Sequence, residues 1–249
     1  MKNKFRKISI WIGKIILAFF GFSLFFVVLF KFVPVYYTPL MFIRVCEQIK
    51  EGKPVKIDHD WVPISKISSN MIQAVVASED NLFMEHNGFD LKQIKIAREE
   101  AEKGKRVRGA STITQQAAKN VFLWQGKSYF RKGLEAYFTV LIEFIWGKER
   151  IMEVYLNSIE MGNGIYGVEA VSLAHFHKNA DKLSKKEAAL IAATLPNPRK
   201  FSSAKPSSYM LKRQTKIVSL MGKIATVDFS KSEKDNKNKT KISDKKGKK

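Results

Sequence analysis

Residues 109–120 read Gly-Ala-Ser-Thr-Ile-Thr-Gln-Gln-Ala-Ala-Lys-Asn, a run of hydroxyl and amide side chains at the start of a predicted helix, 111–122. A helix start presents unpaired N–H groups and a positive dipole, which favour phosphate or sugar oxygens as ligands. Ordinary Ser/Thr capping explains one or two of these residues, but not all of them. The stretch therefore predicts a helical framework that binds an anionic or sugar-like ligand at one helix end.

Helical patterns also dominate the chain on both sides of this stretch, whereas strand-type alternation is weak. Apolar residues spaced by three and four extend a long helix after Ser128, and Gly147 is a natural stop for it. Ser184 to Glu187 fits a capping box, and Pro196 ends the helix that follows. The fold class is therefore mainly α, with helices predicted over residues 69–78, 90–104, 111–122, 128–147, 148–157, 166–177, 184–195 and 208–224.

The N-terminus carries an apolar run over residues 8–30, about 23 residues, which suffices to cross a bilayer of about 30 Å. A cleaved signal peptide is the alternative, but that would need a shorter run and small residues at a cleavage site. The basic N-terminus should remain in the cytoplasm, which leaves the rest of the chain outside. We therefore predict a cytoplasmic segment 1–7, a transmembrane helix 8–33, one extracytoplasmic domain 34–226 and a Lys-rich disordered tail 227–249.

The formal net charge is +21, and about half of the excess lies at the two chain ends. A basic domain favours anionic partners, namely nucleic acid, anionic lipid or a phosphorylated ligand. An extracytoplasmic domain does not meet nucleic acid, so a lipid headgroup or lipid-linked phosphate fits better. Cys46 is the only cysteine, and no intramolecular disulfide can form.

Acidic side chains follow the predicted helix 69–78, in the run Glu79-Asp80-Asn81-Leu82-Phe83-Met84-Glu85-His86-Asn87-Gly88-Phe89-Asp90. Acids at a helix C-terminus oppose the dipole, which indicates either a solvated turn or a carboxylate placed in a cleft as acid or base. A second cluster, Lys127-Ser128-Tyr129-Phe130-Arg131-Lys132-Gly133-Leu134-Glu135, joins three cations to one acid. The cations favour an anion, although Glu135 could simply pair with Arg131 one turn away.

Together these patterns resemble the peptidoglycan glycosyltransferases, glycosyltransferase family 51. Five family motifs occur in order, and the second matches in full: Glu79-Asp80 with Phe83, His86, Gly88 and Asp90; Gly109 with Ser111 to Gln116, Lys119 and Asn120; Arg131-Lys132 with Glu135; Lys148 with Ile151 and Tyr155 to Asn157; and Gly164 with Gly167, Ala170, Phe176 and Lys178. Two positions depart from the family pattern, because Lys127 replaces the usual Arg and His175 the usual Tyr.

The resemblance implies a lysozyme-like, mainly helical domain with a small membrane-associated lobe, and lipid II as substrate. Glu79 would be the catalytic base, and Glu135 would act at the diphosphate leaving group. No cofactor is required, while a divalent ion (Mg²⁺ or Mn²⁺) near Glu135 stays open. The substrate-binding residues implied are Asp80, Phe83, His86, Ser111, Thr112, Gln115, Gln116, Lys119, Asn120, Lys127, Arg131 and Lys132.

The expected location is the cell inner membrane, with the catalytic domain in the periplasm. Expected partners are lipid II, the nascent glycan and the membrane, and other cell-wall synthesis or division proteins stay open. A wall-cleaving hydrolase or lytic transglycosylase is one rival, although it has no diphosphate to bind, and a non-catalytic scaffold is the other. The S-x-x-K spacing from Ser202 to Lys205 is a chance match, since no K-T-G follows and no transpeptidase activity is expected.

Overall fold

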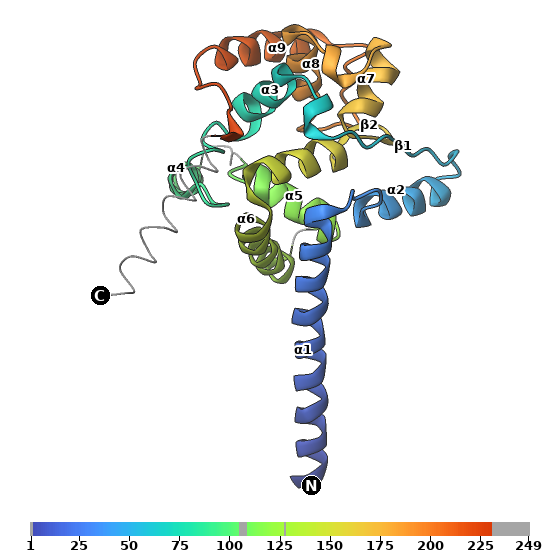
Figure 1. The fold of residues 1–249 in the computed structure, drawn as a ribbon, viewed down its shortest axis with the longest axis vertical. Coiled ribbons are helices and arrows are strands. Elements are labelled where there is room, and N and C mark those ends of the chain that lie inside the picture. The colour runs from blue at the N-terminus through green and yellow to red at the C-terminus, as the bar shows by residue number, and fades with distance from the viewer. Residues whose placement is uncertain (1, 105–108, 127, 231–249) are drawn as a thin grey trace.

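The computed structural model describes residues 2–104, 109–126 and 128–230, in which α1 (Lys2–Phe32) projects from a helical domain (Figure 1). The domain helices are α2 (Pro39–Lys50), α3 (Ser69–Glu79), α4 (Leu91–Glu102), α5 (Ile113–Phe122), α6 (Tyr129–Ser158), α7 (Val168–Phe176), α8 (Lys185–Thr194) and α9 (Ser208–Met221). Short elements complete it: the 3₁₀ turns η1 (Ile64–Lys66) and η2 (Ala180–Lys182), and strands β1 (Asp58–His59), β2 (Glu160–Gly162) and β3 (Ile165–Tyr166). The mainly α fold class is confirmed.

Helix boundaries follow local capping chemistry. Asp90 and Ser128 accept backbone N–H bonds at the starts of α4 and α6, and Ser184 forms a capping box with Glu187 at α8. Gly147 interrupts α6 with φ 77° and ψ 168°, so two helical segments meet there at a kink. The first cap differs from expectation, because Ser68 rather than Ser69 or Asn70 receives the bond at α3.

A small sheet in the order β1-β3-β2 lies where the sequence predicted none. β1 pairs parallel to β3, and β2 pairs antiparallel to it with a register shift between Glu160 and Gly162. Each strand spans only two or three residues, too few for an alternating pattern to appear.

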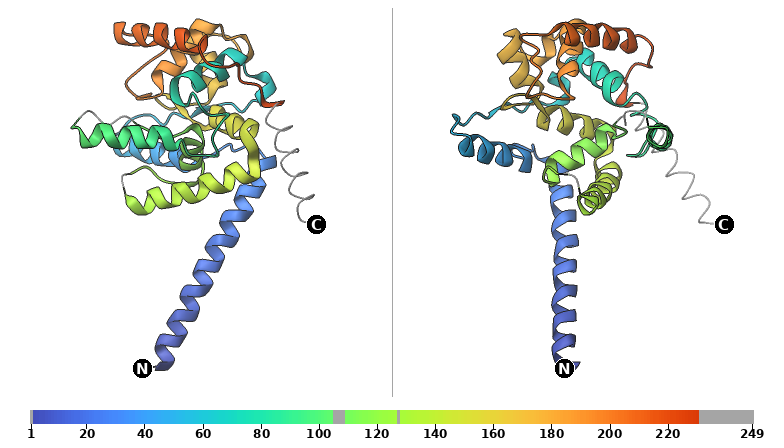
Figure 2. Two further views of the ribbon diagram at one scale, coloured as in Figure 1. Left: turned by 90° about the vertical axis from the view of Figure 1, so that its left-hand side faces the viewer. Right: turned by 180° about the vertical axis from the view of Figure 1, so that it is seen from behind.

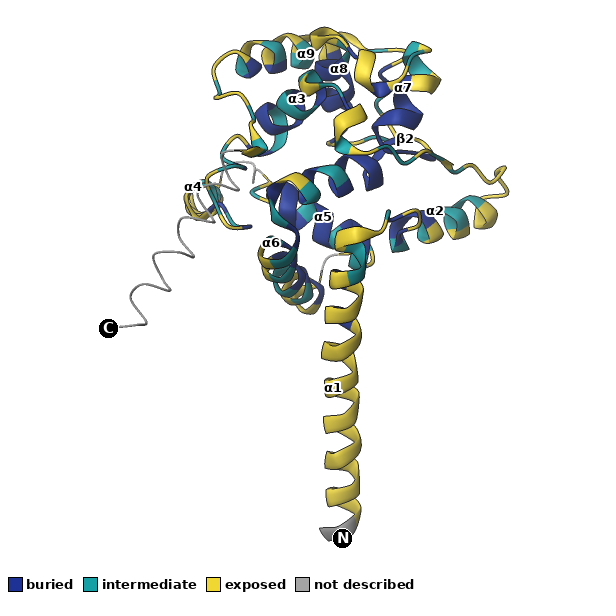
Figure 3. Ribbon diagram, in the orientation of Figure 1, coloured by how far each residue is buried: buried dark blue, intermediate teal, exposed yellow. Residues whose placement is uncertain are grey.

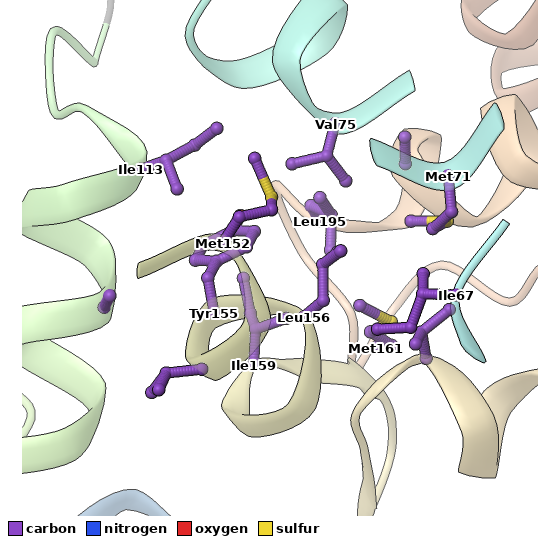
Figure 4. Close-up of a cluster of buried hydrophobic side chains, with 14 of the residues drawn as sticks. Ile67, Met71, Val75, Ile113, Met152, Tyr155, Leu156, Ile159, Met161 and Leu195 are labelled. Carbon is purple, nitrogen blue, oxygen red and sulfur yellow. The ribbon is translucent and has the colours of Figure 1, made fainter. Parts of the chain in front are cut away.

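The core joins helices that are distant in the sequence. Figure 4 shows Val75 of α3, Ile113 of α5 and Tyr155 of α6 within one apolar cluster, and all three are fully buried. Burial of this cluster holds the C-terminal end of α3 close to the N-terminal end of α5. The acids that end α3 and the polar residues that begin α5 therefore share one region.

α1 is long and apolar enough to cross a membrane over Lys4–Phe32, and it is exposed along most of its length (Figure 3). The C-terminal part of α1 packs beside the first half of α6 (Figure 2). The Ser23 and Tyr137 hydroxyls lie 2.7 Å apart, and Trp146 Nε1 donates to the Val27 carbonyl at 2.6 Å. Arg150 donates to the Phe30 carbonyl. α1 is therefore docked on the domain rather than attached only through the chain.

The packed chain continues past the domain boundary predicted at residue 226. Gln73 of α3 donates to the carbonyls of Met221 and Ala225 and accepts from the Val227 N–H. Val227 and Phe229 also contact the core. The first residues of the predicted tail, Val227 to Phe229, therefore pack on the domain. Residues 231–249 lie outside the described residues.

Two glycines share a backbone conformation that side chains avoid, φ 77° and ψ 168° at Gly147 and φ 80° and ψ 161° at Gly167. A Cβ at Gly147 meets nothing within 4 Å, whereas one at Gly167 comes within 2.7 Å of the Asn157 carbonyl oxygen. We expect Gly147→Ala to cost about 1–3 kcal/mol of unfolding free energy, and Gly167→Ala clearly more, because the backbone must also shift. Chemical denaturation of both variants checks this, and equal losses would contradict it.

Candidate active site

Glu79, the last residue of α3, lines a pocket of about 250 Å³ together with Asp80, Ser111 and Thr112. Its carboxylate accepts from Ser78 Oγ at 3.0 Å and from Gln116 Nε2 at 3.4 Å. Arg213 of α9 lies 3.6 Å from Glu79 Oε1 and also donates to Ser78 Oγ at 3.3 Å. The pocket therefore holds a partly accessible carboxylate that neighbours from three helices orient.

Asp80 joins the end of α3 to the start of α5. Its carboxylate accepts from the Ile113 N–H at 2.9 Å and contacts His86 Nε2 at 2.9 and 3.0 Å. Nearby, Thr112 Oγ1 donates to the Gly88 carbonyl at 2.7 Å. An acid at a helix N-terminus is also stabilised by the dipole. Asp80 thus fixes the wall of the pocket in which Glu79 lies.

Glu135 is 3% exposed and lies among cations. Arg131 Nη1 donates to its Oε2 at 2.8 Å, and Lys132 Nζ pairs with its Oε1. The Arg131 side chain is 10% exposed and that of Lys132 is 47% exposed, so Lys132 is the more open to a ligand. A buried carboxylate needs such partners, because desolvating an unpaired charge is costly.

A continuous set of contacts links the two acids. Ser111 lines the Glu79 pocket, and its Oγ accepts from Lys132 Nζ at 3.4 Å, while Lys132 pairs with Glu135. On α5, Gln116 contacts Glu79, and Lys119, about one turn further on, interacts electrostatically with Glu135. The two carboxylates therefore border one polar region instead of facing opposite sides of the domain.

Burial shapes the ionisation of this region. Desolvation lowers the pKa of the Lys119 ammonium, and Glu135 only partly offsets it. An anion bound beside Lys119 would restore the preference for its charged form. Desolvation also raises the pKa of the Tyr155 hydroxyl, to which the charges of Glu79 and Asp80 add. Tyr155 therefore stays protonated and donates to Gln116 Oε1 at 3.3 Å.

Several residues that were predicted to contact the substrate are buried in the domain. Phe83, Gln115 and Asn120 are 0%, 4% and 3% exposed, and their part in substrate binding stays a prediction. Gln115 is occupied by the capping box of α5, in which its Oε1 accepts from the Thr112 N–H. Lys127 lies outside the described residues.

Sequence reasoning missed two charged groups next to the site. Arg213 lies 135 residues after Ser78 and belongs to no local pattern that points to Glu79. Glu143 accepts from Thr114 Oγ1 at 2.7 Å and from Lys148 Nζ at 2.6 Å, and this ammonium lies 4.6 Å from the centre of the Phe83 ring. In the sequence, the pairing of Glu143 with Lys148 is indicated only by their separation of five residues, with the predicted helix break at Gly147 between them.

A divalent ion at Glu135 does not fit the residues around it. Both carboxylate oxygens are bonded to cationic donors, which compete with a metal for the same lone pairs. Within residues 2–104, 109–126 and 128–230, no group of three His, Cys, Asp or Glu side chains gathers as a metal site.

Taken together, the mainly helical fold and a pocket carboxylate beside a cation-bound acid define the transglycosylase class of glycosyltransferases. A family model described as transglycosylase matches residues 46–222. The chain is 56% identical over 216 residues to a biosynthetic peptidoglycan transglycosylase of Bacteroides thetaiotaomicron, covering 87% of each chain. It is 51% identical over 218 residues to a protein of the same name from Bdellovibrio bacteriovorus, covering 88% of this chain and 87% of the relative. This chain therefore belongs to the transglycosylase family, and the resemblance noted from its motifs is confirmed.

Arg213 offers a test of how Glu79 is oriented. We expect Arg213→Gln to lower the transferase kcat by on the order of tenfold or more, because one charge-assisted hydrogen-bonding group contributes about 1.5–3 kcal/mol. Arg213→Lys should recover part of the rate. Lys212→Gln, an exposed neighbour on α9, is the control and should leave kcat unchanged. Wild-type kcat in Arg213→Gln would contradict the orienting role.

His175, where the family pattern has Tyr, lies away from Glu79 and contacts Ser203 Oγ through Nδ1 at 2.7 Å. Burial, with the nearby Lys56 charge, lowers the pKa of His175 below its ordinary value of 6.5. The unfolded chain then binds this proton more readily, so stability is lost as the pH falls below about 6.5. We expect the unfolding free energy of His175→Gln to fall less than that of the wild type between about pH 6.5 and 5. Burial also lowers the pKa of His59, but this effect is common to both proteins and cancels in the comparison. Equal slopes of unfolding free energy against pH in the two proteins would overturn the prediction.

Proposed function

We propose that this protein polymerises peptidoglycan glycan chains, transferring the growing lipid-linked glycan from undecaprenyl diphosphate to the 4-hydroxyl of lipid II. The observation that carries the proposal is the Glu79 pocket, linked through Ser111 and Lys132 to the cation-bound Glu135. The relatives are named biosynthetic peptidoglycan transglycosylases, which supports a role in peptidoglycan synthesis.

In the proposed reaction Glu79 accepts the proton of the acceptor 4-hydroxyl. The acceptor oxygen attacks C1 of the lipid-linked sugar, and the bond from C1 to the diphosphate oxygen breaks with inversion from α to β. Arg213 and Gln116 support this role, because they hold the carboxylate from two sides. A base in such a position contributes about 10²- to 10⁴-fold to the rate.

The leaving group is undecaprenyl diphosphate, whose negative charge needs stabilisation more than it needs a proton. Of Lys119, Arg131 and Lys132, Lys132 is the most exposed and would contact it, while the other two reinforce the positive potential. Glu135 orients Arg131 and Lys132 through its two oxygens. These side chains supply the charge, and the proposal requires no cofactor.

The same cations distinguish this function from wall cleavage. A hydrolase or lytic transglycosylase acts on a glycan that carries no diphosphate, and has no use for cations beside its second acid. A monofunctional transferase therefore accounts for more of the charged groups than either rival does.

Topology supports a place at the bacterial inner membrane with the domain in the periplasm. The basic residues that precede the span favour a cytoplasmic N-terminus. α6 packs against the outer part of α1 and exposes Phe144 and Phe130, which suits contact with lipid. A lipid-linked substrate would then keep its lipid tail in the bilayer beside this surface.

Glu79→Gln tests the function most directly. We expect it to reduce polymerisation of lipid II by about 10²- to 10⁴-fold, because the base is lost at nearly constant shape. Gel analysis of glycan products from the full-length protein in detergent measures this, with thermal unfolding as a check of the fold. Glu99→Gln, on the exposed surface of α4, should polymerise normally. Normal glycan synthesis by Glu79→Gln would exclude the proposed base, and release of fragments from finished wall would favour a hydrolase.

A further inference from the structure

A second pocket, of about 470 Å³, lies next to the Glu79 pocket. Its volume falls in the range of about 300–1,000 Å³ that is usual for ligand sites. Asn81, two residues after Glu79, lines both pockets, so a ligand at Glu79 can extend into the second one. One wall is the loop after α3, and the other is the chain that follows α9. The lining comprises Val76, Asn81, Leu82, Met84, Glu85 and residues 223–228.

The C-terminal wall of this pocket is held in place. The Gln73 side-chain amide bonds to the backbone of Met221, Ala225 and Val227 at 3.0–3.3 Å. The Lys223 N–H donates to the Leu220 carbonyl, which turns the chain back from the end of α9. This wall lies beyond residue 222, where the match to the transglycosylase family model ends. One wall of the pocket therefore lies inside the matched residues, and the other lies after them.

The lining suits a peptide better than another sugar. Leu82, Met84 and Ile224 provide apolar surface for small side chains. Lys223 supplies one positive charge, and Glu85 and Asp228 supply two negative charges. A peptide attached to a sugar through its N-terminus ends in a carboxylate, which Lys223 can pair with. Its backbone N–H groups can donate to Glu85 and to the Asn81 side chain.

We propose that this pocket binds the stem peptide of the lipid-linked substrate while the sugar occupies the Glu79 pocket. The assignment rests on the proposed function, because lipid II carries a pentapeptide on the sugar whose C1 reacts. The peptide branches from the same ring as the reacting carbon, so it leaves the Glu79 pocket close to Asn81. The pocket then selects substrate by the peptide, in addition to the sugar and diphosphate.

The test compares two substrates for the full-length protein, lipid II and the same lipid-linked disaccharide without its peptide. We expect wild-type kcat/KM to be about tenfold higher for lipid II, the effect of about 1.4 kcal/mol from one charged contact. Lys223→Ala should lose most of this preference by lowering the value for lipid II alone. Lys212→Ala, an exposed lysine on α9 that does not line the pocket, is the matched control and should keep the preference.

The possible failures are distinguishable. If the wild type polymerises both substrates equally well, or if Lys223→Ala lowers both values to the same extent, the peptide pocket is overturned while the polymerase function stands. If the wild type polymerises neither substrate, the proposed function falls and this inference falls with it. A peptide preference that Lys223→Ala leaves intact would also overturn the assignment to this pocket.

Discussion

The site depends on the buried carboxylate of Asp80. This carboxylate accepts hydrogen bonds from the Ile113 N–H and from His86 Nε2. A buried carboxylate with hydrogen-bond donors fixes the position of both segments that supply them. Glu79 precedes it directly in the chain, and Thr112 precedes Ile113. The relation between the acid and the start of α5 therefore follows from one set of hydrogen bonds, supported by the apolar cluster around Val75, Ile113 and Tyr155.

The cationic region shows how opposing electrostatic demands are met. Glu135 is buried and needs positive partners, whereas Lys119 is half-buried, and desolvation lowers the pKa of its ammonium group. Lys132 is about half exposed, and it pairs with the buried Glu135 on one side while it remains open to a ligand on the other. Excess positive charge at the surface suits an incoming diphosphate, and the interior pairs maintain the geometry when none is bound.

Local chemistry made much of the fold predictable. Asp90, Ser128 and Ser184 act within three residues of their own position, and Gly147 needs no partner to break a helix, so sequence patterns located these features. The small sheet was missed because its strands are too short to carry a period. In the site, Glu79, Gln116 and Glu135 were found through motifs, whereas Arg213 and Glu143 act through contacts that no local spacing encodes. The sequence did not reveal that the Gln115 side chain takes part in the capping box of α5.

The packing of α1 against α6 makes the N-terminal helix part of the folded unit and not an exchangeable tether. The Trp146 indole and the Arg150 guanidinium both find their acceptors on backbone carbonyls at the outer end of that helix. A fragment lacking the helix, or a chimera with a foreign one, would leave these donors and their apolar surroundings uncovered, and each lost bond would cost about 0.5–1.5 kcal/mol. Truncated forms should therefore tend to self-associate. The contacts between α1 and α6 also fix the distance of the domain from the membrane surface.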